Sequence, residues 1–419
     1  MEKKSPRPSP LAPCPMLRGV FMKKVVLAFS GGLDTSCAVK WLQDQYGFEV
    51  ICFSAFIGEV SDKEKLRRKA KACGASKIYI EDLKKEFAQD FILPALWAQA
   101  RYEGRYPLAT ALGRPLIAKH LVRIAEKEGA EYVAHGCTGK GNDQVRIEVG
   151  TRTLNSKLKI VAPLREWEFK TREEEIEYAK QNNIPVEATK ASPYSIDKNI
   201  WGIAIEAGIL EDPWREPPED AYVMTRGLAK VPKKARYIEI DFVKGVPVKL
   251  DGKKKNLVDM IESLNEIAGE YGVGRFDQIE NRLVGIKSRE VYEAPAAEVL
   301  LKAHGELEGM VMDRDFIHYK KLLSEKYAQL VYFGLWFSPL KESLDQFFKS
   351  NQNRVTGKIR MKLDHGHAIC VGRRSDYSLY SEKLATYSEG DTFDRTSAEG
   401  FMKIWGLPYE GMKSKKKLK

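Results

Sequence analysis

The sequence predicts an α/β protein in which a doubly wound parallel sheet is followed by a second, α+β domain. Three observations predict this fold. Short, continuously apolar segments alternate with helical ones from residue 22 to about 185, as in parallel sheets that carry helices on both faces. After residue 185 the apolar segments come in pairs around short turns, as in antiparallel hairpins. The chain has 419 residues, of which 43% are hydrophobic and 30% charged, enough for more than one core.

The elements of the first domain follow from apolar spacing and from glycine stop signals. Apolar residues recur at helical spacing in several segments that end at Gly47, Gly74 or Gly129, and glycine is the usual residue just beyond a helix. We expect strands at 25–29, 50–55, 77–80, 132–135 and 160–162, and helices at 35–46, 63–73, 114–128 and 171–181. Strand and helix units in this order build a parallel sheet.

The second domain is expected to contain two hairpins and the helices between them. One hairpin pairs 236–242 with 246–250, and the other pairs 354–363 with 367–372 around Asp364-His365-Gly366. A helix is expected at 257–271. We place the domain limits at 22–185 and 186–384, with a disordered, proline-interrupted extension at 1–21 and a C-terminal segment at 385–419. This last segment has too few apolar residues to fold alone, so we expect it to dock on a neighbouring molecule.

Charge and cysteine content narrow the class of protein. The formal net charge is +11, which raises the question of nucleic acid binding. Residues 1–24 and 413–419 each carry about +5, so the body is nearly neutral and solvated basic tails are the simpler interpretation. No segment approaches the ~20 apolar residues of a membrane span. The six cysteines form no CxxC pair, which indicates a reducing compartment, and we predict a cytoplasmic protein without membrane or nucleic acid partners.

The strongest motif is SGGLDTS at 30–36, between the first predicted strand and the first predicted helix. Gly31 and Gly32 allow positive φ and close backbone approach, and the helix that follows directs free N–H groups to the same point. The motif's hydroxyl groups add donors, and Asp34 can hold Mg²⁺ through water. A helix terminus contributes only about 0.3–2 kcal/mol to anion binding, so a triphosphate needs further cations. The alternative interpretation is an ordinary turn with a helix cap.

Two common nucleotide motifs are missing. Gly139-Lys140 is followed by Gly141 rather than by Ser or Thr, and no GxGxxG occurs, which argues against phosphate-loop kinases and dinucleotide enzymes. The motif at 30–36 instead resembles the pyrophosphatase-type loop, or PP-loop, of ATP-dependent adenylating enzymes. Enzymes of this class cleave ATP between the α and β phosphates. The first domain would then have the adenine-nucleotide alpha-hydrolase-like fold.

A second glycine-rich segment, 135–146, follows the strand expected at 132–135. Its polar side chains can bind a zwitterion, because Thr138 and Asn142 can donate to carboxylates and Asp143 can accept from an ammonium group. Arg146 offers a bidentate fork to a carboxylate. Taken alone, the segment is equally consistent with a solvated loop.

Several longer motifs resemble the argininosuccinate synthase family. They are YEGRYPLAT at 102–110, HGCTGKGNDQVR at 135–146, SPYSIDKN at 192–199, EAGILEDPW at 206–214 and GVGRFDQIENRLVGIKSREVYE at 272–293. The resemblance extends from about residue 23 to 406. It implies ATP-dependent ligation of L-citrulline and L-aspartate to argininosuccinate through a citrullyl-AMP intermediate, in arginine biosynthesis. It also implies Mg²⁺, a nucleotide-binding domain at 22–185, a synthetase domain at 186–384 and a homotetramer whose C-terminal segment is exchanged between subunits.

The resemblance also implies ligand contacts at individual positions. ATP would be bound by Ala28, Phe29, Ser30, Gly31, Gly32, Leu33, Asp34, Thr35, Ser36, Ala55 and Gly136. Aspartate would be bound by Thr138, Asn142 and Asp143, and citrulline by Tyr106, Asn142, Arg146, Ser195, Glu280 and Tyr292. Phe56, Glu59, Ala111 and Ala204 depart from the pattern expected for the family. Phe56 and Glu59 concern the adenine and ribose contacts, whereas Ala111 and Ala204 each lack a serine hydroxyl, which is typically worth ~0.5–1.5 kcal/mol where its hydrogen bond is made.

Two other function classes remain open at this point. One is a PP-loop ligase that thiolates or amidates tRNA, although such an enzyme would be expected to have catalytic cysteines or an amidotransferase domain. The other is a noncatalytic protein that binds nucleic acid through its basic tails.

Overall fold

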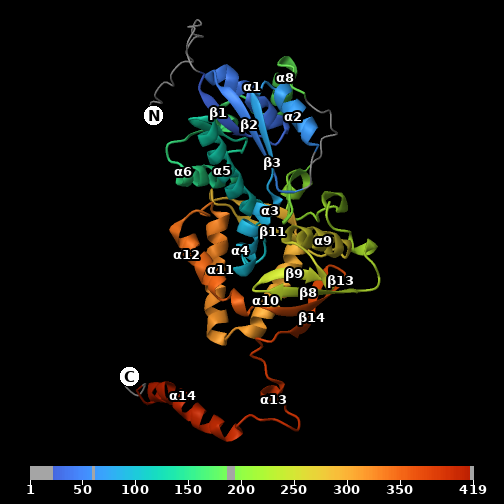
Figure 1. Cartoon of the computed structure of the whole chain (residues 1–419), viewed down its shortest axis with the longest axis vertical. Coiled ribbons are helices and arrows are strands. Elements are labelled where there is room, and N and C mark those ends of the chain that lie inside the picture. The colour runs from blue at the N-terminus through green and yellow to red at the C-terminus, as the bar shows by residue number, and fades with distance from the viewer. Residues whose placement is uncertain (1–21, 59–61, 186–193, 416–419) are drawn as a thin grey trace.

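The computed structural model describes residues 22–58, 62–185 and 194–415. The predicted extension at 1–21 and Glu59 lie outside these residues. The parallel-sheet domain occupies one end of the molecule and the α+β region its middle, while the C-terminal helix lies apart from both (Figure 1).

The first domain contains the predicted parallel sheet. Its strands are β1 (Lys24–Ala28), β2 (Glu49–Phe56), β3 (Lys77–Asp82), β4 (Tyr132–Ala134) and β5 (Lys159–Val161), in the order β3-β2-β1-β4-β5. All neighbouring strands are parallel. Because β1 lies between β2 and β4, the strands that follow β1 in the chain are added first on one side of β1 and then on the other. The strand order therefore reverses at the carboxyl end of β1. Ligands of open α/β sheets bind at such a switch point.

Helices cover both faces of this sheet, as predicted. On one face, α1 (Leu33–Tyr46), α2 (Lys63–Ala72) and α8 (Arg172–Gln181) form a core with alternate strand residues such as Val25 and Leu27. On the other face, α5 (Ala109–Glu128) and α6 (Asp143–Leu154) pack on residues such as Val26 and Val133. The short α7 (Pro163–Glu166) follows β5. Side chains that alternate along one strand therefore belong to two different cores.

Two predicted boundaries differ from the structure by more than three residues. The helix expected from residue 114 begins at Ala109, so Pro115 lies inside it. Proline is favoured in the first turn of a helix, but the turn that precedes Pro115 is buried and helical as well. The segment expected to be loop as far as Arg146 becomes helix α6 at Asp143. Its many polar residues hid the helical period, because this helix faces a cavity as well as the core.

The chain from Lys84 to Trp97 leaves the sheet and packs in the middle of the molecule. It forms α3 (Lys84–Glu86), the π-helix η1 (Phe87–Ile92) and α4 (Leu93–Trp97). Phe87 and Leu96 belong to one hydrophobic core together with Leu264 and Leu300 of later helices. Trp97 donates its indole N–H to the Gly245 carbonyl at 3.0 Å. Apolar packing thus joins the sheet domain to the following region over a wide area.

The region after residue 194 has the predicted α+β character and contains two antiparallel sheets. One sheet has the order β11-β12-β7-β6, and the other has the order β10-β9-β8-β13-β14. The strands are β6 (Ser195–Asn199), β7 (Gly202–Glu206), β8 (Arg236–Val243), β9 (Val246–Leu250), β10 (Lys253–Lys254), β11 (Arg275–Asn281), β12 (Lys287–Glu293), β13 (Gly357–Asp364) and β14 (His367–Arg374). The two predicted hairpins are β8-β9 and β13-β14, whereas β6-β7 and β11-β12 were not predicted.

The helices of this region pack on the second sheet and on one another. They are α9 (Leu257–Glu270), α10 (Pro295–Val311), α11 (Arg314–Tyr332) and α12 (Pro339–Ser350). Short 3₁₀ segments occur at Gly208–Glu211, Glu219–Ala221, Leu228–Lys230 and Gln352–Arg354. The helix expected at 257–271 is α9, whose N-cap Asn256 accepts from the Asp259 amide at 2.9 Å.

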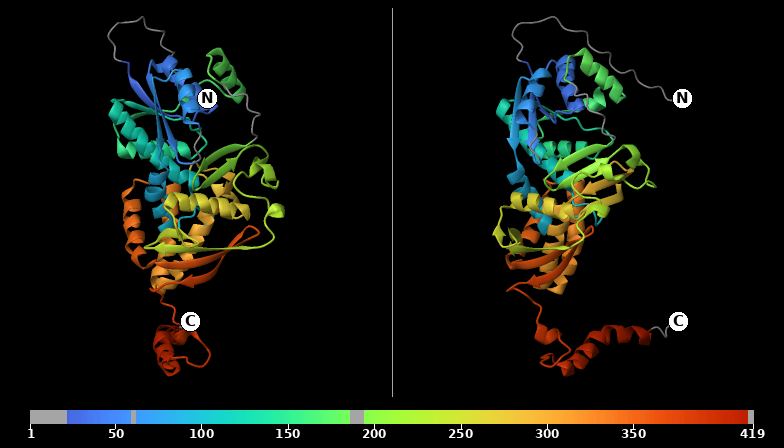
Figure 2. Two further views of the ribbon diagram at one scale, coloured as in Figure 1. Left: turned by 45° about the vertical axis from the view of Figure 1, so that its right-hand side comes forward. Right: turned by 90° about the vertical axis from the view of Figure 1, so that its right-hand side faces the viewer.

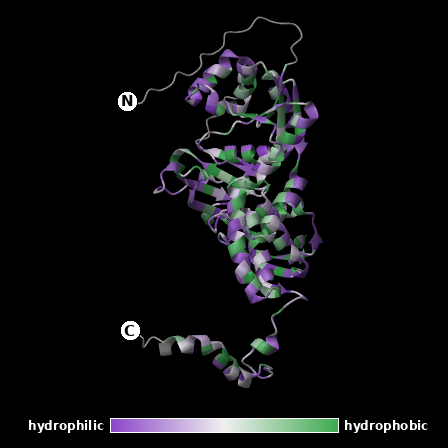
Figure 3. Ribbon diagram, turned by 90° about the vertical axis from the view of Figure 1, so that its left-hand side faces the viewer, coloured by the Kyte–Doolittle hydropathy of each residue, from purple (hydrophilic) through white to green (hydrophobic). Residues whose placement is uncertain are grey.

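The C-terminal segment contains α13 (Glu382–Ala385) and the long α14 (Arg395–Lys415). Figures 1 and 2 show α14 away from the body of the molecule in every view. Apolar residues nevertheless occur along it (Figure 3), and Trp405 is 63% exposed. None of the helices in the described part of the chain combines the length and apolar content that crossing a bilayer requires.

Candidate active site

The loop between β1 and α1 presents backbone and hydroxyl groups at the switch point. Gly31 has φ +78°, a conformation that L side chains rarely adopt. Ser30 Oγ lies 3.2 Å from the Gly32 amide nitrogen and 3.1 Å from Thr35 Oγ1. The helix starts without a side-chain cap hydrogen bond at its N-cap Gly32. The free amides of the first turn are therefore available to an anion.

The ends of β2 and β4 flank this loop. Gly136 follows β4, and a Cβ at this position would lie 2.8 Å from Thr35 Cγ2, so only glycine fits there without displacing Thr35. Ala55 lies near the end of β2, two residues beyond Phe53, which pairs with Ala28 of β1 in the parallel register. The structure thus brings together the residues predicted for ATP at one edge of the sheet.

A cavity of about 300 Å³ extends from this edge to the β11-β12 sheet. It is lined by every residue predicted for aspartate or citrulline and by two predicted for ATP. These are Thr138, Asn142, Asp143, Tyr106, Arg146, Ser195, Glu280 and Tyr292, together with Asp34 and Gly136. Ser195 begins β6, Glu280 lies on β11 and Tyr292 lies on β12. Residues more than 130 positions apart in the chain therefore share one cavity.

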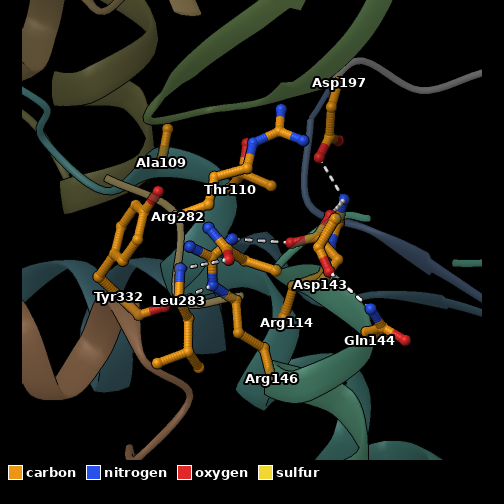
Figure 4. A network of polar contacts seen from close by, with 12 residues as sticks. Ala109, Thr110, Arg114, Asp143, Gln144, Arg146, Asp197, Arg282, Leu283 and Tyr332 are labelled. Carbon is orange, nitrogen blue, oxygen red and sulfur yellow. Dashed lines mark hydrogen bonds and ion pairs between the residues drawn. The ribbon is translucent and has the colours of Figure 1, made fainter. Parts of the chain in front are cut away.

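Asp143 lies between two arginines in this cavity (Figure 4). Arg114 and Arg146 contact its two carboxylate oxygens, each at 2.8 Å. Burial alone would raise the pKa of Asp143, but the two guanidinium groups hold it below its usual value. Arg114 also forms an ion pair with Asp197 of β6. The carboxylate of Asp143 is consequently ionised and fixed in position.

Glu280 is held by neutral donors. It is only 3% exposed, Tyr292 donates its hydroxyl to Oε2 at 2.7 Å, and Gln278 Nε2 lies 3.2 Å from the same oxygen. Tyr332 donates its hydroxyl to Oε1. Burial raises the pKa of both tyrosines, so both remain protonated donors. No ion pair involves Glu280 among the described residues, which leaves a buried carboxylate without a cation.

One hydrogen bond joins the glycine-rich loop to the β11-β12 hairpin. The Leu283 amide donates to Asn142 Oδ1 at 3.0 Å. The amide oxygen of Asn142 is therefore engaged, and its Nδ2 group remains as a donor towards the cavity.

Sequence reasoning missed several residues of the cavity wall. They are Thr110, Arg114, Asp197, Glu206, Arg282, Glu290 and Tyr332. Arg282 pairs with Glu206 at 2.6 Å and with Glu290 at 2.5 Å. Burial and the charge of Glu206 raise the pKa of Glu290 to about 7. Asp197 and Arg282 lie inside motifs that the sequence singled out, whereas Tyr332 lies in an apolar segment and gave no signal.

The residues around Asp34 have the oxygen donors that Mg²⁺ prefers. Asp34 lines the cavity. The burial of the neighbouring Glu175, together with the negative charge of Asp34, raises the pKa of Glu175 to about 8. Glu175 Oε2 is buried and has no hydrogen-bond partner. No cluster of three or more His, Cys, Asp or Glu that could hold a metal occurs in the described chain.

Comparisons with known proteins identify the family of this chain. The family profile of the arginosuccinate synthase N-terminal HUP domain matches residues 24–185, and that of the arginosuccinate synthase C-terminal domain matches residues 194–412. The fold and site thus define an ATP-dependent ligase with a HUP nucleotide-binding domain. The chain belongs to the argininosuccinate synthase family, whose members ligate citrulline and aspartate in arginine biosynthesis.

Similar proteins include argininosuccinate synthase from Dictyoglomus thermophilum, with 58% identity over 385 residues, 92% of this chain and 96% of that protein. Argininosuccinate synthase from Bacillus subtilis is 56% identical over 386 residues, 92% of this chain and 95% of that protein. A solved U34-tRNA thiolase NcsA from Methanococcus maripaludis aligns over 40% of this chain and 60% of its own. It has 17% identity and a TM-score of 0.26. The alternative of a tRNA-modifying PP-loop ligase is not favoured.

Proposed function

We propose that this chain makes argininosuccinate in the cavity between its sheet domain and the β11-β12 sheet. The observation that carries the proposal is the convergence on this cavity of Asp34 from the PP-loop, the ionised Asp143 and the unpaired Glu280. A phosphate site and two sets of amino acid ligands within one cavity suit a reaction that joins two amino acids at the expense of ATP.

In the first half-reaction, the ureido oxygen of citrulline attacks the α phosphorus of ATP. The bond between the α phosphorus and its bridging oxygen breaks, and pyrophosphate leaves. Residues 28–36 and Gly136 would hold the nucleotide, with the loop amides and hydroxyls taking up the negative charge of the departing pyrophosphate. Ala55 would lie against the nucleoside.

Citrulline recognition is assigned to groups of opposite charge. Arg146 would bind the carboxylate, since its guanidinium offers a fork to two oxygens. Glu280 would bind the ammonium group, which supplies the cation that this buried carboxylate lacks. Tyr106, Asn142, Ser195 and Tyr292 would complete the site. The ring of Tyr106 stacks on that of Tyr292 with centroids 3.9 Å apart, which fixes both.

In the second half-reaction, the aspartate ammonium group releases a proton to solvent, the free amine attacks the activated ureido carbon, and AMP leaves with the former ureido oxygen. Thr138 and Asn142 would donate to the carboxylates of aspartate, and Asp143 would accept from its ammonium group. The ion pairs with Arg114 and Arg146 keep Asp143 ionised for this contact. The reaction then needs correct placement rather than a covalent enzyme intermediate.

Mg²⁺ is proposed as a companion of the nucleotide. Asp34 would hold it through water, with Ser30 and Thr35 hydroxyls nearby. When bound, the cation neutralises charge on the phosphate chain.

The assembly, the compartment and the domain limits at 22–185, 186–384 and 385–419 are also proposed. We propose a homotetramer in which α14 docks on another subunit, because its apolar residues, including Phe401, Ile404 and Trp405, are 63–71% exposed in one chain. The described cysteines are free thiols, which supports the cytoplasm as the compartment.

The proposed function is tested by product analysis with purified protein. AMP and pyrophosphate should appear from ATP only when both citrulline and aspartate are present. Formation of ADP would contradict the proposal, and so would equal turnover when asparagine, glutamine or ammonia replaces aspartate.

Sedimentation of the full chain and of a chain ending at residue 384 tests the assembly, since only the full chain should be tetrameric.

A further inference from the structure

Tyr332 is a buried tyrosine that lines the cavity, although it lies outside the segments 135–146 and 272–293 that supply many of the other cavity residues. It is the last residue of α11, and it is 1% exposed yet lines the cavity wall. Gly334, with φ +77°, follows it and allows the chain to turn away.

Tyr332 contacts Arg146 in two ways. Its carbonyl oxygen accepts from Arg146 Nε at 2.9 Å, and its ring centroid lies 4.8 Å from the guanidinium carbon. A second guanidinium nitrogen of Arg146 donates to Asp143. These contacts hold the plane of the guanidinium group and leave its other N–H groups for a ligand carboxylate.

The opposite end of Tyr332 contacts Glu280. The phenol hydroxyl donates to Oε1, while Tyr292 and Gln278 donate to Oε2. Both carboxylate oxygens are thus restrained, and the carboxylate retains only a small part of its acceptor capacity for a ligand N–H group.

One rigid side chain therefore connects the cationic and the anionic groups assigned to citrulline. The ring itself is immobilised, because it stacks on Tyr102 with centroids 3.5 Å apart and a 5° interplanar angle. The carbonyl and the hydroxyl of this one immobilised residue thus contact Arg146 and Glu280 respectively.

We infer that Tyr332 is a positioning residue that sets the Arg146 to Glu280 separation and thereby selects ligands with an ammonium and a carboxylate on one carbon. The inference rests on the proposed function, since it deepens the citrulline assignments of Arg146 and Glu280. The phenol hydroxyl acts through Glu280 on the ammonium group, and the ring and carbonyl act through Arg146 on the carboxylate.

The test is direct binding of citrulline to the full chain by titration calorimetry, followed by competition with two analogues. One analogue, 5-ureidopentanoate, lacks the ammonium group, and the other, 4-ureidobutylamine, lacks the carboxylate. Tyr332→Phe removes only the hydroxyl and keeps the ring beneath Arg146. Tyr327→Phe is the matched control, because Tyr327 lies on the same helix, is fully buried and donates its hydroxyl to Asp345 at 2.9 Å, outside the cavity.

We expect Tyr332→Phe to weaken citrulline binding about tenfold, since it removes a hydrogen bond to a charged group. Its preference for citrulline over 5-ureidopentanoate should fall by a similar factor, whereas its preference over 4-ureidobutylamine should stay within about twofold. Tyr332→Leu should reduce both preferences. Tyr327→Phe should change neither.

Equal citrulline affinity in the unmodified protein and Tyr332→Phe would overturn the inference and leave the proposed function standing. The same holds if both preferences change equally in Tyr332→Phe, or if Tyr327→Phe reproduces its effect. If the unmodified protein does not bind citrulline with or without ATP, the proposed function fails and the inference fails with it.

Discussion

The carbonyl oxygen of Tyr332 accepts a hydrogen bond from Arg146 Nε at 2.9 Å. This contact joins the end of α11 to the first turn of α6, 186 positions earlier in the chain. It means that the cationic group proposed for citrulline is positioned by the second half of the molecule. Substitutions of either partner should therefore affect citrulline binding more strongly than nucleotide binding.

Gly334→Ala should disturb this contact. A Cβ on Gly334 would lie 2.8 Å from Arg146 Cα, and the residue has φ +77°. Gly252 is the matched control, because it also has φ +77° and no heavy atom lies within 4 Å of the added Cβ. Both substitutions should cost about 1–2 kcal/mol of stability for the left-handed backbone, and Gly334→Ala about 1–3 kcal/mol more for overpacking.

The measurements are denaturant unfolding and the Michaelis constant for citrulline. Only Gly334→Ala should raise that constant. Equal stability losses in the two variants would show that Arg146 yields freely to the extra methyl group.

Arg146→Lys should weaken citrulline binding about tenfold. A lysine ammonium cannot serve Tyr332, Asp143 and a ligand carboxylate as the planar fork does. Arg152→Lys, an exposed position on the same helix, is the control. The Michaelis constants for citrulline, aspartate and ATP should be compared, and an unchanged value for citrulline would refute the carboxylate assignment.

Asp34→Asn should slow pyrophosphate release about a hundredfold while it changes citrulline binding little. The substitution keeps the size of the side chain and removes the charge proposed to hold Mg²⁺ through water. The rate should be measured across a Mg²⁺ titration, with Asp44→Asn on the same helix as the control. A turnover number that does not change would remove Asp34 from the metal role.

His304 should make stability depend on pH. It is fully buried, Gln99 Nε2 lies 3.0 Å from its Nδ1, and its Nε2 lies 3.0 Å from Gln352 Oε1. Burial lowers the pKa of His304 in spite of the nearby Glu308. Below the ordinary histidine pKa of about 6.5, the unfolded chain binds a proton that the folded chain does not. Stability is therefore lost as the pH falls through that value.

Melting temperatures at pH 7.5 and 5.5 test this expectation. His304→Gln should show a smaller decrease between the two pH values than the unmodified protein, while His318→Gln, at an exposed position, should match the unmodified protein. Equal decreases in all three proteins would assign the acid sensitivity elsewhere.

The sequence was sufficient to predict the parallel sheet, because the strands of the first domain are buried on both faces and read as apolar runs. It also placed the PP-loop correctly between β1 and α1, since glycines and hydroxyls at a strand end have few other uses. The hairpins β8-β9 and β13-β14 were predictable from their turns and alternation.

Other features were not predictable for physical reasons. Helix α6 carries cavity-facing polar residues such as Asp143 and Arg146, which obscure its helical period. Arg114 owes its role to Asp143 and Asp197, partners that only the fold brings together. Tyr332 looks like an ordinary core residue in the sequence, because its contacts with Arg146 and Glu280 join segments that are distant in the chain. A local sequence pattern can reveal a glycine-rich loop between a strand and a helix. It does not reveal a cavity wall that is built from several distant segments.

The central claim, that citrulline is activated on its ureido oxygen in this cavity, is tested most directly by oxygen transfer. Citrulline labelled with ¹⁸O in the ureido group should be converted with ATP and unlabelled aspartate, and the products analysed by mass spectrometry. The account predicts one ¹⁸O atom in the phosphate of AMP and none in pyrophosphate or argininosuccinate. Unlabelled AMP, formed together with argininosuccinate, would contradict it.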